Sequence, residues 1–217
     1  MPGTSAADPE DHDHAHGGHR EPGNDALHWN ERYAATDRLW SAEPNRTVEE
    51  VVGPLPPGRA LDLGAGEGRH AVWLARRGWR VTAVDFSALG IERGRQQGGA
   101  GSAGRVEWIV GDVRTWQPPS GTTYDLVLVV YLHVTEDVFG RARSWLAPGG
   151  ALVVVGHALR NLTDGVGGPR DPRLLHTEDQ LRAAASGLEI DELREVLRPT
   201  PEGEAIDLLL VAHRPGV

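Results

Sequence analysis

The 217-residue sequence contains no cysteine, which excludes disulfide frameworks, thiolate zinc sites and cysteine nucleophiles together. Lysine is also absent, so every basic side chain except histidine is an arginine. With 31 acidic residues against 22 basic ones, the formal net charge is -9. Because general binding to a nucleic-acid backbone needs a basic face, this balance argues against a nucleic-acid partner.

Long apolar segments are missing as well. No apolar run approaches the roughly 20 residues that cross a bilayer, and the acidic, polar N-terminus is unlike a signal peptide. We therefore expect a cytoplasmic protein without a membrane partner. The length and the 39% hydrophobic content suit one compact domain. Nothing in the sequence indicates an oligomeric state.

Residues 1–26 are predicted to be a disordered, acidic, histidine-rich tail, and residues 27–217 the folded domain. The tail is rich in glycine and proline and has almost no large apolar side chains. His12, His14 and His16 alternate, so in an extended chain they lie on one side and can share a divalent metal. The alternative is a solvated tail that binds nothing. Any metal held there is not expected to be catalytic, and no metal site is predicted in the domain.

After the tail, short apolar strands alternate with helical patterns. Strands are expected at residues 59–63, 80–84, 106–110, 124–130 and 151–155, and helices at 69–77, 89–97 and 136–146. The glycine-rich residues 98–104 are expected to be a flexible link. The alternation predicts a parallel sheet with helices on both faces. The last two strands, 188–197 and 205–213, are joined by a loop too short for a helical crossover, which predicts an antiparallel hairpin.

The segment from Asp62 to Gly68 (Asp-Leu-Gly-Ala-Gly-Glu-Gly) is the most informative part of the sequence. It follows the first strand and opens a helix. Glycines let the backbone approach a ligand closely, and a helix N-terminus offers unpaired N–H groups. Asp85 ends the next strand, where a carboxylate can accept hydrogen bonds from both hydroxyls of a ribose. Together these features indicate a cofactor that contains adenosine.

The spacing Asp62-x-Gly64-x-Gly66 differs from a dinucleotide-binding fingerprint and resembles the first motif of class I S-adenosylmethionine-dependent methyltransferases. The run 111–113 (Gly-Asp-Val) after the third strand, the run 148–150 (Pro-Gly-Gly) before the fifth and the final hairpin resemble the same family. The resemblance covers roughly residues 29–213. It implies an α/β, Rossmann-like, seven-stranded and mostly parallel sheet with strand order 3-2-1-4-5-7-6. It also implies S-adenosylmethionine as the cofactor and S-adenosylhomocysteine as the product.

The resemblance assigns roles to the residues that match the family's motifs. Gly64, Ala65 and Gly66 would back the methionine part of the cofactor. Asp62 would lie near the amino group of that part, directly or through water. The alternative for Asp62 is that its carboxylate only caps a turn.

The adenosine part of the cofactor would be held by residues that follow the second, third and fourth strands. Asp85 would bind the ribose, and Phe86 would pack beside the adenine. Asp112 would accept a hydrogen bond from the adenine amino group, and Val113 would supply a backbone contact. Val130 would end the fourth strand under the cofactor. The alternatives are a turn-capping role for Asp112 and a core position for Phe86.

The segment 29–33 (Trp-Asn-Glu-Arg-Tyr), with Leu39-Trp40 after it, resembles the entrance helix of the small tellurite-resistance and thiopurine-type methyltransferases. In those enzymes the N-terminal segment is a lid over the cofactor. Trp29, Tyr33 and Trp40 would then form an aromatic wall for the sulfonium cation, which is attracted to ring faces. The alternative is a helix that packs these aromatic side chains into the core.

A sulfonium methyl group is already activated, so the protein must mainly hold a nucleophile close to it and exclude water. The first expectation is therefore a small molecule that presents a soft sulfur, selenium or tellurium atom. An O- or N-acceptor in a natural product would need a general base. His133 is the first candidate base, His157 is the second, and Tyr131 would orient the acceptor. The remaining alternatives are structural histidines and a non-catalytic cofactor-binding protein.

The long connection over residues 161–175 is expected to be a loop that can cover a site. Arg160, Arg170 and Arg173 lie in or beside it. They would either meet an anionic substrate or stay in solvent.

Overall fold

The computed structural model describes residues 26–102, 104–134 and 137–216. The predicted histidine-rich tail lies outside these residues except for Ala26, which begins the first helix. The metal-binding prediction for His12, His14 and His16 therefore concerns residues that are not described. No helix in the described ranges is both long enough and apolar enough to span a bilayer.

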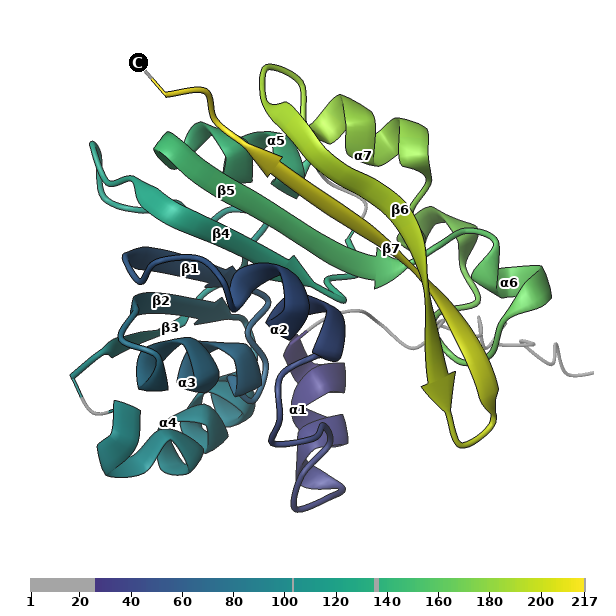
Figure 1. Ribbon diagram of the computed structural model, residues 1–217. Helices are drawn as coiled ribbons and strands as arrows, with labels where there is room; N and C mark the ends of the chain where they lie inside the picture. Colours follow the sequence, from purple (N-terminus) through teal and green to yellow (C-terminus); the bar gives the residue numbers. More distant parts are fainter. Residues whose placement is uncertain (1–25, 103, 135–136, 217) are drawn as a thin grey trace, which may run out of the picture.

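Seven strands form one sheet in the order β3-β2-β1-β4-β5-β7-β6, which confirms the predicted topology (Figure 1). Neighbouring strands from β1 to β5 pair in parallel, and β7 runs antiparallel to both β5 and β6. The strands are β1 (Arg59–Leu63), β2 (Arg80–Asp85), β3 (Val106–Val110), β4 (Tyr124–Val130), β5 (Leu146–His157), β6 (Glu189–Thr200) and β7 (Gly203–His213).

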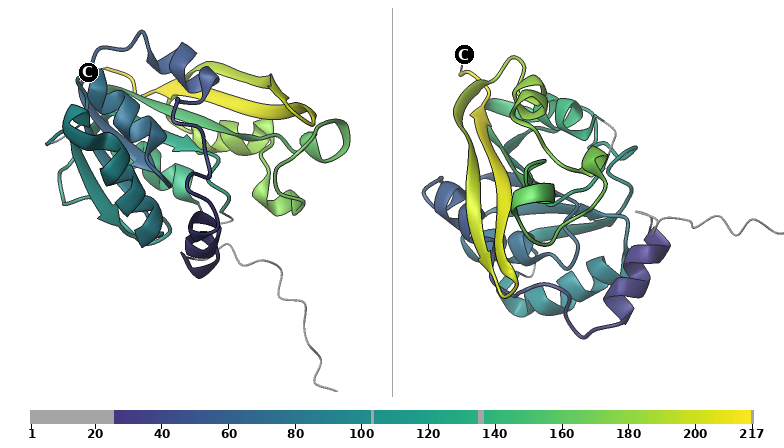
Figure 2. Two further views of the ribbon diagram at one scale, coloured as in Figure 1. Left: turned by 90° about the horizontal axis from the view of Figure 1, so that it is seen from below. Right: turned by 90° about the vertical axis from the view of Figure 1, so that its right-hand side faces the viewer.

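Helices cover both faces of the sheet, as predicted (Figures 1 and 2). They are α1 (Ala26–Ala34), α2 (Arg46–Val52), α3 (Arg69–Arg76), α4 (Ala88–Ser102), α5 (Val138–Ser144), α6 (Asn161–Asp164), the 3-10 turn η1 (Pro172–Leu174) and α7 (Glu178–Ala184). The capping box that opens α7 is complete: Thr177 and Gln180 each accept a hydrogen bond from the other's backbone N–H.

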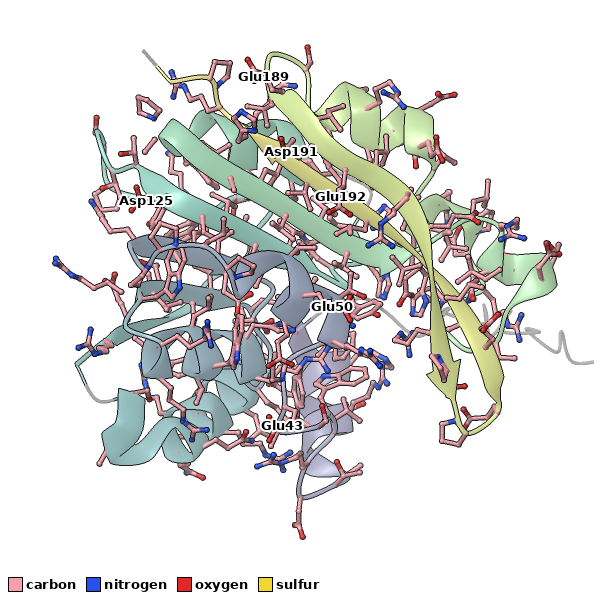
Figure 3. The ribbon with its side chains drawn as sticks, in the orientation of Figure 1. Glu43, Glu50, Asp125, Glu189, Asp191 and Glu192 are labelled. Atoms are coloured by element: carbon pink, nitrogen blue, oxygen red, sulfur yellow. The ribbon has the colours of Figure 1, made fainter. Side chains whose placement is uncertain are left out.

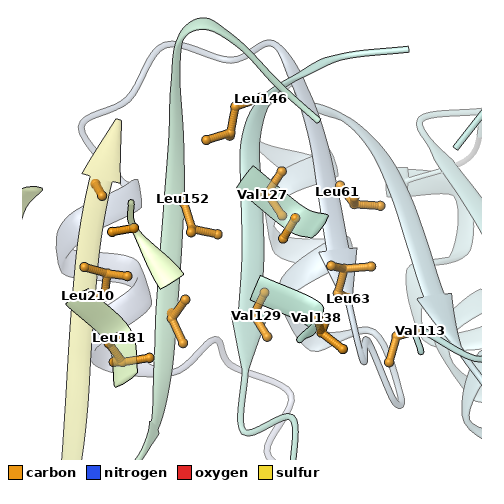
Figure 4. Packing of buried hydrophobic residues seen from close by; sticks show 14 of the residues in the cluster. Leu61, Leu63, Val113, Val127, Val129, Val138, Leu146, Leu152, Leu181 and Leu210 are labelled. Carbon is orange, nitrogen blue, oxygen red and sulfur yellow. The ribbon is translucent and has the colours of Figure 1, made fainter. Parts of the chain in front are cut away.

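The core has two layers, because successive side chains of a strand point to opposite faces. In β4, Val127 and Val129 join the cluster under α5 and α7, which Figure 4 shows from close by. Leu126 and Leu128 join the cluster under α2 and α3. Both sets are fully buried. This explains why β4 is a continuous apolar run in the sequence.

Two elements differ from the prediction. The helix expected to end near residue 97 continues as α4 to Ser102, with a non-helical backbone at Gly99 (φ 49°, ψ −153°). Gly98 is buried, and a Cβ there would lie 2.2 Å from Oγ of Ser102, so this segment packs closely where a flexible link was expected. The fifth strand is longer than the predicted 151–155: it starts at Leu146, which pairs with Tyr124 of β4, and ends at His157, which pairs with Asp207 of β7.

The β6–β7 hairpin extends beyond the end of the strand beside it. The last pair of β5 and β7 joins His157 to Asp207, whereas β6 and β7 continue to pair as far as Thr200 and Gly203. The end of the hairpin therefore projects past β5 as a two-stranded ribbon (Figure 1).

Candidate active site

The segments that follow four parallel strands line one cavity, here called the inner pocket. They are joined by aromatic residues from α1 and the loop after it. The predicted site residues that line the pocket are Gly64, Ala65, Gly66, Asp85, Phe86, Asp112, Val113, Val130, Tyr131 and His133, together with Trp29, Tyr33 and Trp40. Of the residues predicted to touch the cofactor, Asp62 does not line it.

The glycine-rich turn is held to the end of β2 by Asp85. One carboxylate oxygen of Asp85 accepts the backbone N–H of Gly66 at 2.9 Å, and the other accepts that of Ser87 at 2.8 Å. Gly66 has a positive φ of 55°, and a Cβ there would lie 2.6 Å from the Tyr33 hydroxyl. Burial raises the pKa of Asp85. The turn therefore requires glycine both for its conformation and for its contact with α1.

Asp62 lies behind the turn, on β1, with 1% of its surface exposed. Its Oδ2 atom is buried and has no hydrogen-bond partner among the described residues. Burial, and then the negative charge of Asp85, raise the pKa of Asp62 to about 7. A buried carboxylate oxygen without a donor is costly, so this atom fits a cationic group that is supplied from outside the chain.

Arg69, the first residue of α3, also lines the inner pocket and was missed by the sequence analysis. It is half-buried, its pKa is lowered by burial, and none of the described carboxylates forms an ion pair with it. Arg69 in the pocket has no ion pair, and the Oδ2 atom of Asp62 behind the turn has no hydrogen-bond donor, among the described residues. The ammonium and the carboxylate of a bound amino acid would satisfy the two together.

The carboxylate of Asp112 is engaged by Arg114. The side chain of Arg114 donates to both oxygens over 2.6–3.0 Å, and its backbone N–H donates at 2.9 Å. Hydrogen bonding to Arg114 lowers the pKa of Asp112. A carboxylate can accept about four hydrogen bonds, and Arg114 already donates four, so an amino group in the pocket would have to displace one of them.

Glu67 fixes the aromatic side of the pocket. Its carboxylate has 3% of its surface exposed; Oε2 accepts the backbone N–H groups of Leu39 and Trp40 at 3.1 Å each, and Oε1 accepts from Arg93 at 3.1 Å. Trp29 lies between Tyr33 and Trp40, with ring centroids 5.8 and 6.4 Å away. Tyr33 is buried, whereas Trp40 is 39% exposed. Tyr33 therefore packs in the core and also lines the pocket, and the aromatic wall for the sulfonium cation stays a prediction.

A second cavity, here called the outer cleft, adjoins the inner pocket. Its volume is about 1180 Å³, and it lies between α1, the loop over residues 166–174 and the end of the β6–β7 hairpin. Trp29, Trp40 and His133 line both cavities. His157 lines only the outer cleft. The two cavities therefore meet beside one histidine and two indole rings.

His133 is a neutral imidazole at this junction. Its Nδ1 atom lies 3.3 Å from the carbonyl oxygen of Leu174. Because a carbonyl only accepts, this contact assigns the proton to Nδ1 and makes Nε2 the basic nitrogen. Burial, and then the nearby His157, lower the pKa of His133 to about 4. The two rings are stacked, with centroids 5.7 Å apart and planes at 9°.

Tyr131 has the only positive φ (52°) of the described non-glycine residues, at the end of β4. Its hydroxyl donates to Asp207 at 2.5 Å and accepts from Nδ2 of Asn45 at 3.1 Å. Burial raises the pKa of Tyr131, as does Asp207, so the hydroxyl stays protonated. The strained backbone is held by these contacts, and they turn the phenol toward Asp207.

Asp207 was also missed by the sequence analysis. It is fully buried, and Arg198 donates to it from Nε at 2.7 Å. Nδ1 of His157 lies 3.2 Å from its other oxygen but is not aligned for a hydrogen bond. Burial raises the pKa of Asp207, but the contacts with His157, Arg198 and Tyr131 together bring it below its usual value. These residues are scattered along the chain, so no local motif indicates them.

Residues 60–150 match the family model of a methyltransferase domain, on a fold whose sheet order and glycine-rich turn were predicted from the class I methyltransferases. The chain belongs to the class I S-adenosylmethionine-dependent methyltransferases. S-adenosylmethionine is its cofactor. The match covers the strands β1 to β4 and the start of β5, which supply most of the inner pocket.

Two curated proteins illustrate the relationship. An uncharacterized methyltransferase of Mycobacterium tuberculosis is 30% identical over 134 residues, which are 60% of this chain and 66% of that protein. A probable non-canonical nonribosomal peptide synthetase of Salinispora arenicola is 34% identical over 153 residues, 62% of this chain. This chain spans just 2% of the synthetase.

Solved structures share the fold of this methyltransferase. The N-methyltransferase NodS of Bradyrhizobium japonicum, in complex with S-adenosylhomocysteine, has a TM-score of 0.66 at 19% identity, over 86% of this chain and 96% of NodS. TehB of Haemophilus influenzae has a TM-score of 0.65 at 18% identity, over 87% of this chain and 66% of TehB. At these identities the similarity concerns the fold.

Proposed function

We propose that this methyltransferase binds S-adenosylmethionine in the inner pocket and transfers its methyl group to a small organic molecule in the outer cleft. The observation that carries the proposal is that the two cavities meet at Trp29, Trp40 and His133. A donor in one cavity and an acceptor in the other would face each other there, which is the arrangement that brings two reactants together without intervening water.

The inner pocket has a suitable group for each part of the cofactor. Asp62 and Arg69 would hold the ammonium and carboxylate of the methionine part, and Asp85 would accept from the ribose. Asp112 would accept from the adenine amino group. When bound, the cofactor supplies a methyl group activated by a sulfonium charge. The ring faces of Trp29 and Trp40 attract such a cation and exclude water.

The acceptor is proposed to be an organic molecule that presents a soft nucleophile, a thiol or a selenol. The outer cleft, with about 1180 Å³, is far larger than an inorganic selenium or tellurium oxyanion, which favours the organic form. His133 would accept the proton of the nucleophile at Nε2, because its lowered pKa keeps it neutral near pH 7. Tyr131 would act as a positioning residue, because its hydroxyl is bound to Asp207.

A second candidate is O- or N-methylation of a small natural product. The neutral His133 beside both cavities favours it, because a phenol or an alcohol needs a general base whereas a thiolate needs little help. A cofactor-binding protein without activity is the third possibility, and it predicts cofactor binding without turnover.

Release of S-adenosylhomocysteine from purified protein tests the proposal. The panel pairs aromatic and aliphatic thiols and selenols with phenols and amines of the same size, and includes selenite and tellurite. We expect turnover with the organic thiols and selenols. Turnover confined to phenols or amines would establish the second candidate. No product with any acceptor, with cofactor binding intact, would contradict both enzymatic proposals.

His133→Gln separates the two enzymatic candidates. We expect a loss of about 100-fold or more in kcat for a phenol, and a much smaller loss for a thiol above its pKa, where no base is needed. His213→Gln is the matched control, because His213 lies on β7 in contact with Glu189 and Asp191, away from both cavities. An unchanged kcat for every acceptor in His133→Gln would exclude His133 as the base.

A further inference from the structure

The outer cleft has a basic lining although the chain carries a net charge of -9. Four arginines line it, and they face two acidic residues in the lining and Asp207 just behind it. The arginines are Arg32, Arg170, Arg173 and Arg198. Three acidic residues of β6, Glu189, Asp191 and Glu192, lie at the opposite end of that strand from Arg198 (Figure 3). The sign of the charge around the cleft therefore differs from that of the molecule as a whole.

Arg198 is the best-positioned of these cations. Its Nε donates to the buried Asp207 at 2.7 Å, and its Nη2 lies 3.4 Å from the second carboxylate oxygen. Its Cζ lies 5.4 Å from the centre of the Tyr131 ring. A guanidinium has five N–H donors, so the contacts with Asp207 leave at least three for a ligand. About one third of the Arg198 side chain is exposed, which makes it a fixed donor at the surface of the cleft.

Arg170 is exposed on the loop beside the hairpin and forms no ion pair within the described ranges. Arg173 beside it is bound to Asp171, so that pair contributes little net charge. Arg160, which the sequence analysis grouped with these two, pairs with Asp164 and Glu195 and does not line the cleft. The anion-binding role expected for this loop therefore falls on Arg170, which lines the same cleft as Arg198.

We propose that the acceptor carries an anionic group, a carboxylate or a sulfate or phosphate ester, that is bound by Arg198 and Arg170 while its nucleophile lies beside His133. The inference rests on the proposed function, since it names the class of acceptor for the same site. Arginine binds such groups through two parallel N–H donors, and Arg198 is already held in place by a buried carboxylate. Both ends of the acceptor would then be fixed in the cleft.

Matched acceptors test the proposal. The value of kcat/KM is measured for mercaptobenzoate and hydroxybenzoate against their methyl esters, which have the same nucleophile without the charge. We expect the acids to be preferred by about 10- to 100-fold. Arg198→Gln and Arg170→Gln should each remove most of this preference. Arg194→Gln, which removes an arginine of β6 that pairs with Glu192 outside the cleft, should leave it unchanged.

Binding provides a readout that does not depend on turnover. Calorimetry with the protein saturated in S-adenosylhomocysteine compares benzoate, phenyl sulfate and phenyl phosphate with benzamide. The three anions distinguish a carboxylate site from an ester site. If Arg198→Gln does not fold, Arg198→Lys keeps the charge beside Asp207 but not the two parallel donors. It should weaken anion binding by about 10-fold.

The possible outcomes distinguish a failure of the anionic acceptor from a failure of the proposed methyl transfer. Equal turnover of acids and esters, or a preference that survives both glutamine variants, overturns the anionic acceptor and leaves the methyl transfer standing. Anion binding that depends on Arg198 without turnover of any acceptor supports the anion site and contradicts the methyl transfer. If no acceptor is turned over and benzoate binds no better than benzamide, both the anion site and the methyl transfer are overturned.

Discussion

At the scale of single residues, a buried carboxylate lies behind the glycine-rich turn of the inner pocket. Asp62 is almost fully buried, one of its oxygens has no donor, and burial raises its pKa to about 7. Its pKa in the unfolded chain is near 3.8, so the folded state binds the proton more strongly. The contribution of Asp62 to the free energy of unfolding therefore decreases as the pH rises from about 4 to about 7.

Asp62→Asn should have opposite effects on stability and on binding. At pH 8 it removes a buried charge, so we expect the cofactor-free protein to gain about 1–3 kcal/mol in its free energy of unfolding. It also removes the proposed partner of the cofactor's ammonium, so the affinity for S-adenosylmethionine should fall about 10-fold or more. Denaturant unfolding at pH 5 and pH 8 and calorimetric titration measure the two effects.

Asp191→Asn is the control, because Asp191 is an exposed acid of β6 whose contact is with His213. It should leave the cofactor affinity unchanged. An Asp62→Asn protein that is less stable than wild type at pH 8, or one that binds the cofactor equally well, would contradict the proposed role of Asp62.

Residues of the inner pocket were predictable where they follow one another along the chain. The glycine-rich turn and Asp85 belong to one strand-turn-helix-strand unit, so their spacing in the sequence indicates their proximity. Asp207 and Arg198 reach the site from the terminal hairpin, and Asn45 reaches it from α2. Their contacts depend on how the sheet is assembled, which local spacing does not report.

At the scale of elements, the loop between α1 and α2 is fastened to the glycine-rich turn by one side chain. Glu67 accepts from the backbone of Leu39 and Trp40 and from Arg93 of α4. Trp40, which lines both cavities, is thereby placed at their junction. The segment resembles a lid in sequence, and the structure adds the residue that fixes its position.

Glu67→Ala should release this loop. We expect KM for both cofactor and acceptor to rise about 10-fold, with a smaller change in kcat, because the loop positions the reactants rather than taking part in proton transfer. Amide hydrogen exchange should increase at Leu39 and Trp40. Glu92→Ala, which removes an exposed acid of α4 that pairs with Arg95, is the control. Unchanged exchange at the loop in Glu67→Ala would contradict this role.

The boundaries of the elements were less predictable than their order. The alternation of strands and helices indicated the parallel sheet, and the strand order 3-2-1-4-5-7-6 was confirmed. The glycine-rich end of α4 was predicted wrongly, because a run of glycines usually indicates a flexible link. Here the absence of a side chain at Gly98 permits close packing against Ser102, and that gain comes from a tertiary contact.

At the scale of the whole molecule, buried histidines make stability depend on pH. Burial lowers the pKa of His70 strongly and, with the nearby His157, lowers those of His133 and His176 to about 4. In the unfolded chain these three histidines are protonated near pH 6.5, whereas in the folded chain they stay neutral until the pH is much lower. The free energy of unfolding therefore falls as the pH drops from about 6.5 to about 4, against a smaller opposing contribution from the buried acids of the inner pocket.

His176→Gln should make this dependence less steep. The ring of His176 is buried against Gly156 and lies 5.5 Å from that of Phe139, so its protonation would place a charge in the core. We expect the slope of the unfolding free energy to decrease by up to about 1.4 kcal/mol per pH unit between pH 4.5 and pH 6. Denaturant titrations at several pH values measure it.

His213→Gln should not have this effect. Hydrogen bonding to Asp191 raises the pKa of His213, so this exposed residue contributes to stability at low pH and loses that contribution as the pH rises. Its removal should leave the acid-side slope as steep or make it steeper. An identical slope for wild type and His176→Gln would contradict the neutral, buried imidazole.

The projecting end of the β6–β7 hairpin forms one wall of the outer cleft, and we expect it to be the stiffer of the two walls. The ribbon is braced where Val166 donates to the carbonyl of Glu204 at 3.1 Å and where Ile206 donates to the side chain of Asn161 at 2.7 Å. Because of these hydrogen bonds, we expect the hairpin end and the loop beside it to move together, as one unit attached to the sheet at its base. The opposite wall of the cleft is α1. It is linked to the rest of the domain by the contact of Asn30 with Ser87 and by the loop that Glu67 holds in place. We therefore expect the cleft to open by movement of α1, so that the mobility of this helix limits the rate at which an acceptor enters or leaves.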